Sequence, residues 1–363
     1  MKLTVAGCLD RQKRLRQVLE KRGLKGAIIS RRDHVYYFTG FQSLRFFAGA
    51  ALIETEGSCT LVGADFGSDK YAADELIEYP GAFYSTMHSE QFEAVADKLR
   101  PFVANKSCLG VDLGGGIACV AALAGNDAVD ITRDIYRLRK AKHEDELHAL
   151  QAAISLTEAM YDSAKKSVRP GVDEVDVLAE LRATITRAAG EDLEFIGNDF
   201  QANAMGGLAR RRLMEAGELY ILDAGVCLHG YYADNCRTIS VDRSPTDVQM
   251  KVWERIDGVF SELESAVQPG VLAGDLFTIA NNHFDGHGFS GMVHHLGHGV
   301  GMSPHETPEI NPEYEAVFEV GDVFTMEPGL YSPELKAGIR LEENYHLSKS
   351  GLQKLTKYSR NLC

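Results

Sequence analysis

The sequence lacks the cysteine arrangements that build extracellular scaffolds or cysteine-rich zinc sites. Its seven cysteines are odd in number and scattered, and no two of them stand at a C-x-x-C spacing. Disulfide frameworks usually contain an even number of cysteines, and cysteine zinc sites usually contain C-x-x-C pairs. The cysteine pattern therefore argues against both classes and indicates reduced thiols in a cytoplasmic protein.

Long basic runs and long apolar runs are also missing. The net charge is −14, and the basic cluster Arg210-Arg211-Arg212 is short, which argues against nucleic acid as the main partner. No stretch is long and apolar enough to span a membrane. Only four residues precede Val5-Ala6-Gly7-Cys8, too few for the apolar region of a secretory signal. We therefore expect a soluble protein with neither nucleic-acid nor membrane partners.

Length and composition are those of a two-domain globular protein. The chain has 363 residues, 45% hydrophobic and 25% charged, whereas one domain usually holds roughly 100–200 residues. The charged segment 137–142 separates two parts with different patterns. We place the domain boundary there and predict that this linker is exposed.

The first part has the short alternating elements of an α/β domain. Apolar runs predict strands, and apolar residues at a helical period predict helices. Strands are predicted at 27–29, 35–38, 51–53, 60–62 and 109–111, with helices at 71–76, at 91–99 and between Asp10 as cap and Gly23.

The second part combines long amphipathic helices with paired strands. Helices are predicted at 144–166, from Asp173 to Gly190, at 247–267 and at 274–284, and strands at 219–222, 238–241, 323–326 and 339–347. A strand pair, two helices and another strand pair indicate an α+β core.

Five short segments of the second part place an acid or a histidine at a strand end or in a glycine-rich turn. They are Leu222-Asp223-Ala224-Gly225, 233–238, 296–301, Met326-Glu327-Pro328-Gly329 and Arg340-Leu341-Glu342. A carboxylate at the end of an apolar strand is costly to bury without a partner, and a metal ion can be that partner. Each acid taken alone is more typical of a cap or turn residue than of a metal ligand. Four histidines between residues 294 and 305 favour the metal interpretation.

Taken together, these segments resemble one known family. Asp-x-Gly, Asp-x-x-Arg-Thr, Gly-His-Gly-x-Gly followed by His-Glu, Glu-Pro-Gly and Arg-x-Glu occur in the order found in the pita-bread metallopeptidases. That family includes methionine aminopeptidase, aminopeptidase P, prolidase and the metal-free creatinase. In the first part, 37–41 resembles the creatinase-type N-terminal domain. The resemblance implies a creatinase-like α/β domain at 1–136 and an α+β pita-bread catalytic domain at 137–363.

By this resemblance, five residues would be metal ligands: Asp223, Asp234, His298, Glu327 and Glu342. Their four carboxylates would be neutralised by two divalent ions, and the empty site would repel itself. Ligands that are mainly oxygen favour manganese, with cobalt or zinc as alternatives. Two such ions can hold a bridging hydroxide near neutral pH and polarise a carbonyl.

The resemblance also implies roles for residues around the ions. Glu327 would move a proton towards the leaving amine, His305 would steady the tetrahedral intermediate, and His294 would face the substrate. Arg340 would orient carboxylates or substrate, although a structural ion pair explains it nearly as well. The expected reaction is hydrolysis of the Xaa-Pro bond at the N-terminus of dipeptides or short peptides. The expected assembly is a homodimer.

Two positions depart from the family pattern. Peptide-cleaving relatives usually carry a further histidine in a segment comparable to 196–206, where this chain has none and where Asn203 cannot titrate. A thiol, Cys236, replaces a hydroxyl between the second ligand and Arg237. The missing histidine leaves open a two-metal hydrolase or lyase acting on a small non-peptide substrate. Less favoured alternatives are a methionine aminopeptidase, a creatinase-like enzyme and a non-catalytic binding protein.

Overall fold

A computed structural model describes the chain except residues 1, 45, 83–89, 194 and 287–290. The chain forms two compact units, Lys2–Arg139 and Lys140–Cys363, and each is described by itself. None of the helices in the described ranges is long and apolar enough to cross a membrane.

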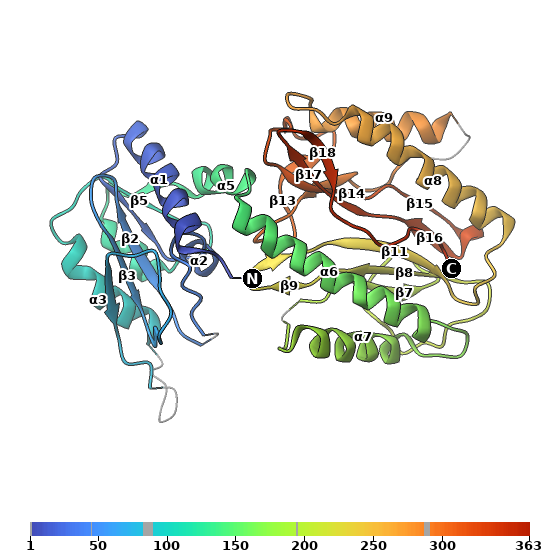
Figure 1. The fold of residues 1–363 in the computed structure, drawn as a ribbon, viewed down its shortest axis with the longest axis horizontal. Coiled ribbons are helices and arrows are strands. Elements are labelled where there is room, and N and C mark those ends of the chain that lie inside the picture. Colours follow the sequence, from blue (N-terminus) through green and yellow to red (C-terminus); the bar gives the residue numbers. More distant parts are fainter. Residues whose placement is uncertain (1, 45, 83–89, 194, 287–290) are drawn as a thin grey trace. The chain divides into compact units, whose positions relative to one another are not determined.

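The N-terminal unit is an α/β domain built on one mixed sheet (Figure 1). Its elements are α1 (Val5–Lys21), β1 (Gly26–Ile29), α2 (Arg32–Thr39), β2 (Ala50–Glu54), β3 (Cys59–Gly63), β4 (Glu75–Glu78), α3 (Gln91–Val103), β5 (Leu109–Val111), α4 (Ala118–Ala121), η1 (Ala122–Ala124), β6 (Val129–Asp130) and α5 (Thr132–Lys140). The strand order is β4-β3-β2-β1-β5-β6. The central strands β1, β2 and β3 are antiparallel neighbours, while β4, β5 and β6 each join in parallel.

Two predicted elements of this unit are wrong. Residues 35–38 lie in helix α2, although β-branched and aromatic residues there are typical of a strand. The helix is buried from His34 to Thr39, so no polar face reveals its period. It ends at Gly40, whose φ of 77° is the left-handed conformation of a helix C-cap. Residues 71–76 are not helical, and Glu75–Glu78 forms strand β4 beside β3.

Helix α1 begins earlier than predicted. Its N-cap is Thr4, whose side-chain oxygen accepts the backbone N–H of Gly7, and Asp10 lies inside the helix. The sequence does not distinguish the two candidates, because threonine and aspartate are both good N-cap residues. The N-cap depends on where the backbone of the chain enters the helix.

The boundary segment is helical to Lys140 and mostly half-buried or buried, which corrects the predicted exposed linker. Helix α5 runs through residue 136, and the predicted domain limit there stays a prediction. The Arg139 side chain is 2% exposed and pairs with Asp33 at 2.8 Å. Lys142 is 1% exposed and pairs with Glu306 at 3.3 Å. Buried charges need such partners, so these basic residues are structural.

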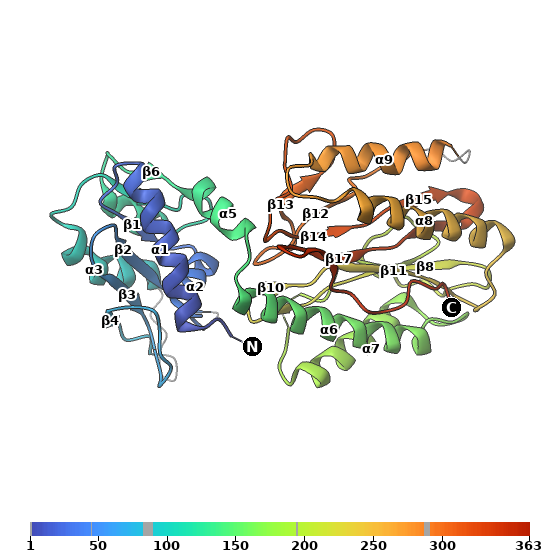
Figure 2. The same ribbon diagram turned by 45° about the horizontal axis from the view of Figure 1, so that its top comes forward.

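The C-terminal unit places strands between two pairs of helices. Its elements are α6 (Glu144–Ser167), α7 (Glu174–Ala189), β7 (Asp199–Ala202), β8 (Leu219–Ala224), β9 (Cys227–Leu228), β10 (Tyr231–Tyr232), β11 (Asn235–Ser240), α8 (Asp247–Ala266), α9 (Ala273–Asp285), β12 (Gly297–Gly299), β13 (Glu306–Ile310), β14 (Val323–Met326), β15 (Gly329–Ser332), η2 (Pro333–Leu335), β16 (Ala337–Arg340), β17 (Glu343–Ser348) and β18 (Gly351–Lys354). Figures 1 and 2 show α6 and α7 on one side of the strands and α8 and α9 on the other.

The sheets of this unit run β11-β8-β7 and β13-β12-β14-β17-β18, with small pairs β10-β9 and β15-β16. Strand β8 is buried along its whole length. Leu219 and Ile221 belong to the core that includes α8 and α9, and Tyr220 and Leu222 to the core that includes α6 and α7. Because both faces are covered, the strand is a continuous apolar run instead of an alternating one.

The strand predicted at 339–347 is two strands. β16 pairs with β15, and β17 pairs with β14. The break falls at Leu341 and Glu342, where the chain passes from one sheet to the other. The sequence pattern cannot reveal a change of strand partner, because that change depends on tertiary pairing.

Candidate active site

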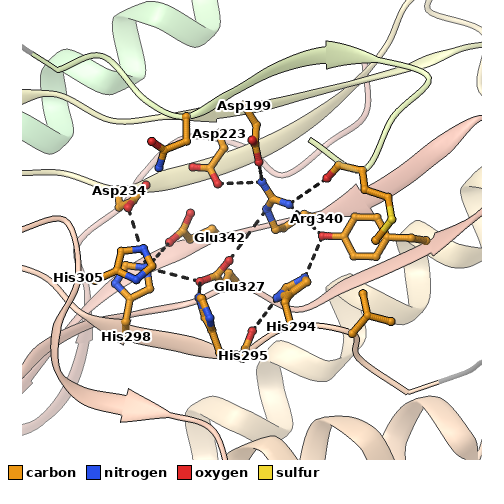
Figure 3. Close-up of a pocket in the computed structure, with 14 residues that line it drawn as sticks. Asp199, Asp223, Asp234, His294, His295, His298, His305, Glu327, Arg340 and Glu342 are labelled. Atoms are coloured by element: carbon orange, nitrogen blue, oxygen red, sulfur yellow. Dashed lines mark hydrogen bonds and ion pairs between the residues drawn. The ribbon is translucent and has the colours of Figure 1, made fainter. Parts of the chain in front are cut away.

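One pocket of the C-terminal unit gathers the predicted site residues (Figure 3). Its lining comprises Asn198, Asp199, Met205, Asp223, Asp234, Val293, His294, His295, His298, His305, Glu327, Tyr331, Arg340 and Glu342. Every residue named in the sequence-based site prediction is among them. Their roles as metal ligands and catalytic groups stay predictions.

Strand pairing brings the acids together from distant parts of the chain. Asp223 lies near the end of β8, and Asp234 directly precedes β11, which runs antiparallel to β8 with Cys236 opposite Asp223. β11 begins at Asn235 and not at residue 238, so Asp234 lies at its start. Adjacent strand ends therefore hold two carboxylates side by side.

The other two acids lie where β14 and β16 end. Glu327 follows β14, and its backbone N–H donates to the Leu296 carbonyl at 2.7 Å. The backbone N–H of Glu342 donates to the Cys236 carbonyl at 3.0 Å. These bonds fix the main chain of each acid, so the carboxylates are positioned by the sheet scaffold.

The acids are buried and poorly satisfied, which is the test of whether cations fit here. The side chains of Asp234 and Glu342 are 3% and 1% exposed. Within the part of the chain that the structure describes, Asp223 Oδ1, Asp234 Oδ1 and both carboxylate oxygens of Glu342 have no hydrogen-bond donor. Buried oxygens without donors are costly. Divalent cations would satisfy all of them, so the donor set fits the metals that the resemblance implies.

A histidine completes the acidic cluster. His298 Nε2 lies 3.5 Å from Glu327 Oε1 and 3.9 Å from an oxygen of both Asp234 and Glu342. The other ring nitrogen, Nδ1, donates to the Gly299 carbonyl at 3.0 Å. That bond leaves the Nε2 lone pair directed at the acids, the arrangement a metal-binding imidazole needs.

The electrostatics of the pocket reflect this crowding. Burial raises the pKa of Asp223 to about 6. Burial, together with neighbouring carboxylates, raises the pKa of Asp234 and of Glu342 well above the ordinary range. Burial also lowers the pKa of His298 to about 4. Like charges this close disfavour ionisation of all the groups together, and positive ions would remove that penalty.

Glu327 differs from the other acids. Burial alone would raise the pKa of Glu327, but a hydrogen bond from His295 and the nearby histidines lower that pKa to about 2. His295 Nε2 lies 2.7 Å from Glu327 Oε1. Glu327 is thus the acid of the cluster with the most stable negative charge.

The histidines form the remaining wall of the pocket. His305 stacks on His298 with ring centroids 3.7 Å apart and is exposed. His294 donates from Nδ1 to the His295 carbonyl at 2.7 Å, and Nε2 lies 2.8 Å from the Tyr331 hydroxyl. The structure also brings nitrogens of His295, His298 and His305 within 4.8 Å of one another.

Arg340 binds carboxylates of the protein itself. Its Nη2 lies 2.8 Å from Asp223 Oδ2 and also contacts Asp199, and its Nη1 lies 3.0 Å from the Tyr331 hydroxyl. These contacts fit both the orientation of carboxylates and the structural ion pair that were weighed for Arg340.

The sequence-based prediction missed two ionisable pocket residues, Asp199 and His295. Asp199 stands opposite Asp223 in the β7–β8 pairing, which no local pattern reveals. His295 precedes the predicted ligand His298 closely, and its place in a histidine-rich segment was the available signal. Asn203 does not belong to the pocket lining, and its side chain lies on an exposed turn.

The thiol that departs from the family pattern is internal. Cys236 is fully buried in β11, and burial raises the pKa of this thiol well above its ordinary value. A thiol held protonated is a poor metal ligand, because the thiolate is the ligating form.

Comparison with known proteins places both parts of the chain. Residues 148–349 match the model of metallopeptidase family M24, and residues 11–141 match the creatinase/prolidase N-terminal domain. A Pyrococcus horikoshii protein named Xaa-Pro dipeptidase is 27% identical over 97% of this chain and 98% of its own length. The uncharacterized peptidase YqhT of Bacillus subtilis is 25% identical over 96% of this chain and 98% of its own length.

Solved structures agree on the fold. The prolidase from Pyrococcus horikoshii superposes with a TM-score of 0.79 at 24% identity, covering 98% of this chain and 100% of that one. An Xaa-Pro dipeptidase from Bacillus anthracis gives 0.80 at 20% identity, covering 98% and 99%. The predicted pairing of a creatinase-like domain with a pita-bread catalytic domain is confirmed. With more than half of its length matched by the catalytic-domain model, the chain belongs to metallopeptidase family M24.

Proposed function

We propose that this metallopeptidase hydrolyses the Xaa-Pro bond at the N-terminus of dipeptides or short peptides. The observation that carries the proposal is the pocket in which four buried acids and His298 converge with oxygens that lack donors among the described residues. Relatives that match nearly the whole chain are named Xaa-Pro dipeptidases, which supports the proline specificity.

Asp223, Asp234, His298, Glu327 and Glu342 would hold two divalent cations. The four carboxylates carry the charge that two such ions neutralise, and mainly oxygen donors favour manganese over cobalt or zinc. When bound, the pair of ions supplies water activation near neutral pH and polarisation of the scissile carbonyl.

The surrounding residues would then divide the remaining tasks. Glu327, which its contact to His295 helps to keep ionised, would accept a proton from the attacking water and pass it to the departing proline nitrogen. His305, exposed beside His298, donates to the oxyanion of the tetrahedral intermediate.

A chain of hydrogen bonds positions His294 towards the substrate. Arg340 donates to the Tyr331 hydroxyl, this hydroxyl donates to His294 Nε2, and His294 Nδ1 donates to the His295 carbonyl. Such a chain fixes both the tautomer and the orientation of the ring. Arg340 is thus a positioning residue in this scheme.

Apolar groups at the pocket suit a proline ring. Met205 and Val293 are exposed at the lining, and the aromatic residue Tyr331 also lines the pocket. A proline imide has no N–H to satisfy, so an apolar wall costs it no hydrogen bond.

A homodimer and a cytoplasmic location complete the proposal. All seven cysteines, each within the described ranges, are free thiols, which suits a reducing compartment. The acidic net charge of −14 argues against nucleic acid as a partner.

Metal add-back on a defined substrate panel tests the proposal. The stripped protein is assayed with and without manganese on Ala-Pro, Gly-Pro, Xaa-Pro-Ala tripeptides, a Met-Ala peptide and creatine. Manganese-dependent cleavage confined to Xaa-Pro bonds is the expected result. Tight binding of two metals without cleavage of any peptide would refute it and favour the small non-peptide substrate, the alternative that the histidine-free segment 196–206 supports.

A further inference from the structure

Asp199 adds a carboxylate to the pocket beyond those that would hold metal. It lies in β7 directly opposite Asp223, and both side chains contact Nη2 of Arg340 (Figure 3). The Asp199 side chain is 20% exposed, so it borders the pocket and is not hidden behind it.

The loop after β7 is shaped around this carboxylate. The backbone N–H of Gly207 donates to Asp199 Oδ1 at 2.6 Å. Gly206 has a φ of 144°, and a Cβ there would lie 2.4 Å from Asp199 Oδ2. Only glycine allows both this backbone conformation and this close approach. Segment 196–206, which lacks the histidine found in peptide-cleaving relatives, therefore encloses the side chain of Asp199 instead.

Arg340 has little capacity left for a substrate. Nη2 is shared by Asp199 and Asp223, and Nη1 lies 3.0 Å from the Tyr331 hydroxyl and 3.3 Å from the Met205 carbonyl. Its side chain is 8% exposed. An incoming carboxylate is bound best by two adjacent N–H groups of a guanidinium. Here both Nη groups already face protein acceptors. Nε has no acceptor in the described structure, but it is buried and lies 4.0 Å from Glu327 Oε2.

The charge balance of the pocket leads to the same conclusion. Among the described lining residues, Arg340 is the side chain with a permanent positive charge. Asp199 and the four acids of the proposed metal site carry five negative charges, which equal the positive charge of Arg340 and two divalent cations, and an activated hydroxide would add one more negative charge. Removing Asp199 would make the loaded pocket one unit more positive and therefore more favourable to a C-terminal carboxylate.

We propose that Asp199 occupies Arg340 and so selects peptides in which proline is followed by another residue over free Xaa-Pro dipeptides. The inference rests on the proposed function and names its substrate class. A free dipeptide brings a carboxylate on the proline next to the scissile bond, where the guanidinium of Arg340 is already paired with Asp199 and Asp223. In Xaa-Pro-Yaa peptides a neutral amide takes that place.

The test compares substrates that differ only in this charge. Steady-state constants are measured for Ala-Pro, Ala-Pro-amide and Ala-Pro-Ala with the manganese-loaded wild type and with Asp199→Asn. Asparagine keeps an oxygen for the Gly207 N–H but removes the charge. We expect the wild type to favour the amide and the tripeptide. In the variant, the KM for Ala-Pro should fall about tenfold relative to that for the amide, the scale of one added charge in a screened pocket.

Controls separate selectivity from folding. Asp176→Asn removes an exposed aspartate whose side chain is 68% accessible and lies outside the pocket lining, and it should leave the ratio unchanged. Melting temperature and manganese content are measured for each variant, and Asp199→Ser repeats the comparison if the asparagine variant melts early. Equal changes in the KM for Ala-Pro and for Ala-Pro-amide in Asp199→Asn would overturn the inference while leaving the proposed function intact.

A binding measurement decides the question independently of turnover. Calorimetric titration of L-proline and L-prolinamide into the manganese-loaded proteins should show Asp199→Asn tightening proline relative to prolinamide by about tenfold. An unchanged ratio would overturn the inference. If the wild type cleaved none of the three substrates, the proposed function would fail, and this titration would still test whether Asp199 neutralises Arg340.

Discussion

Glu342 and Glu343 are neighbours in the sequence, and both are buried. Among the described residues Glu343 pairs with two arginines, whereas Glu342 has His298 Nε2 at 3.9 Å and no arginine or lysine partner. Glu343 Oε2 lies 3.0 Å from Arg237 Nη2, and Oε1 lies 3.5 Å from Arg360 Nη1. Both oxygens of Glu342 lack a donor within the described structure. We therefore predict that replacing each with glutamine changes the stability of the metal-free protein in opposite directions.

The magnitudes follow from the two environments. Glu343→Gln leaves the charge of Arg237 buried without its partner, which costs about 3–5 kcal/mol. At Glu342, burial and then Asp234 raise the pKa, so ionisation of this carboxyl opposes folding. Glutamine removes the charge but still lacks donors, and the net gain is about 1 kcal/mol.

Metal binding should reverse the order of the wild type and Glu342→Gln and leave Glu343→Gln the least stable of the three proteins. A ligand present at 100 times its Kd stabilises the folded state by about 2.7 kcal/mol. For a domain of this size that corresponds to a rise in melting temperature of roughly 5–11 °C. Manganese should give this rise in the wild type and in Glu343→Gln, and little of it in Glu342→Gln.

Thermal unfolding of stripped and manganese-loaded protein, followed by circular dichroism, measures both effects. The reasoning fails if stripped Glu342→Gln melts well below the wild type, because the carboxylate would then have a stabilising partner without metal. It also fails if manganese raises the melting temperature of Glu342→Gln as much as that of the wild type.

Three further predictions concern catalysis, pH and packing. His305→Ala should lower kcat on an Xaa-Pro substrate about 100-fold with unchanged manganese content by elemental analysis; loss of metal would instead make His305 a ligand. Burial raises the pKa of Asp322 to about 6, so the folded state binds a proton that the unfolded state releases near pH 4. The free energy of unfolding should therefore fall by on the order of 2 kcal/mol as pH rises from 4 to 6. Urea unfolding at several pH values should show a weaker pH dependence for Asp322→Asn. Gly299→Ala would place a Cβ 2.2 Å from the Thr307 carbonyl oxygen. This variant should therefore melt several degrees lower, whereas an unchanged melting temperature would contradict the packing argument.

The long amphipathic elements could be predicted from sequence, and the short buried ones could not. Helices α6 to α9 lie where the 3.6-residue period predicted them, because each has one apolar face against a core and one polar face. Residues 35–38 form a helix that is buried all round, so the period is invisible. The wrong strand prediction there shows that residue type decides little when both faces are covered.

The site shows the same division between local and tertiary information. Asp223, Asp234 and Glu327 are recognisable because each interrupts or borders an apolar run at a turn. Asp199 and His295 became visible only through the β7–β8 pairing and through a side-chain contact to Glu327. A sequence motif can identify a side chain that lies at a turn next to an apolar strand. It cannot identify a side chain that reaches the site through strand pairing or through a contact with a residue distant in the sequence.

Burial on both faces of β8 connects the fold to the proposed chemistry. Two layers of helices exclude water from the strand, so Asp223 at its end meets a weakly solvating environment, and its pKa rises. The same exclusion would strengthen every interaction between the acids and a bound cation. Under the proposed function, the features that make the unloaded pocket unstable are those that would make it bind metal tightly. Folding and metal uptake are then linked, and any substitution that relaxes the empty site weakens the loaded one.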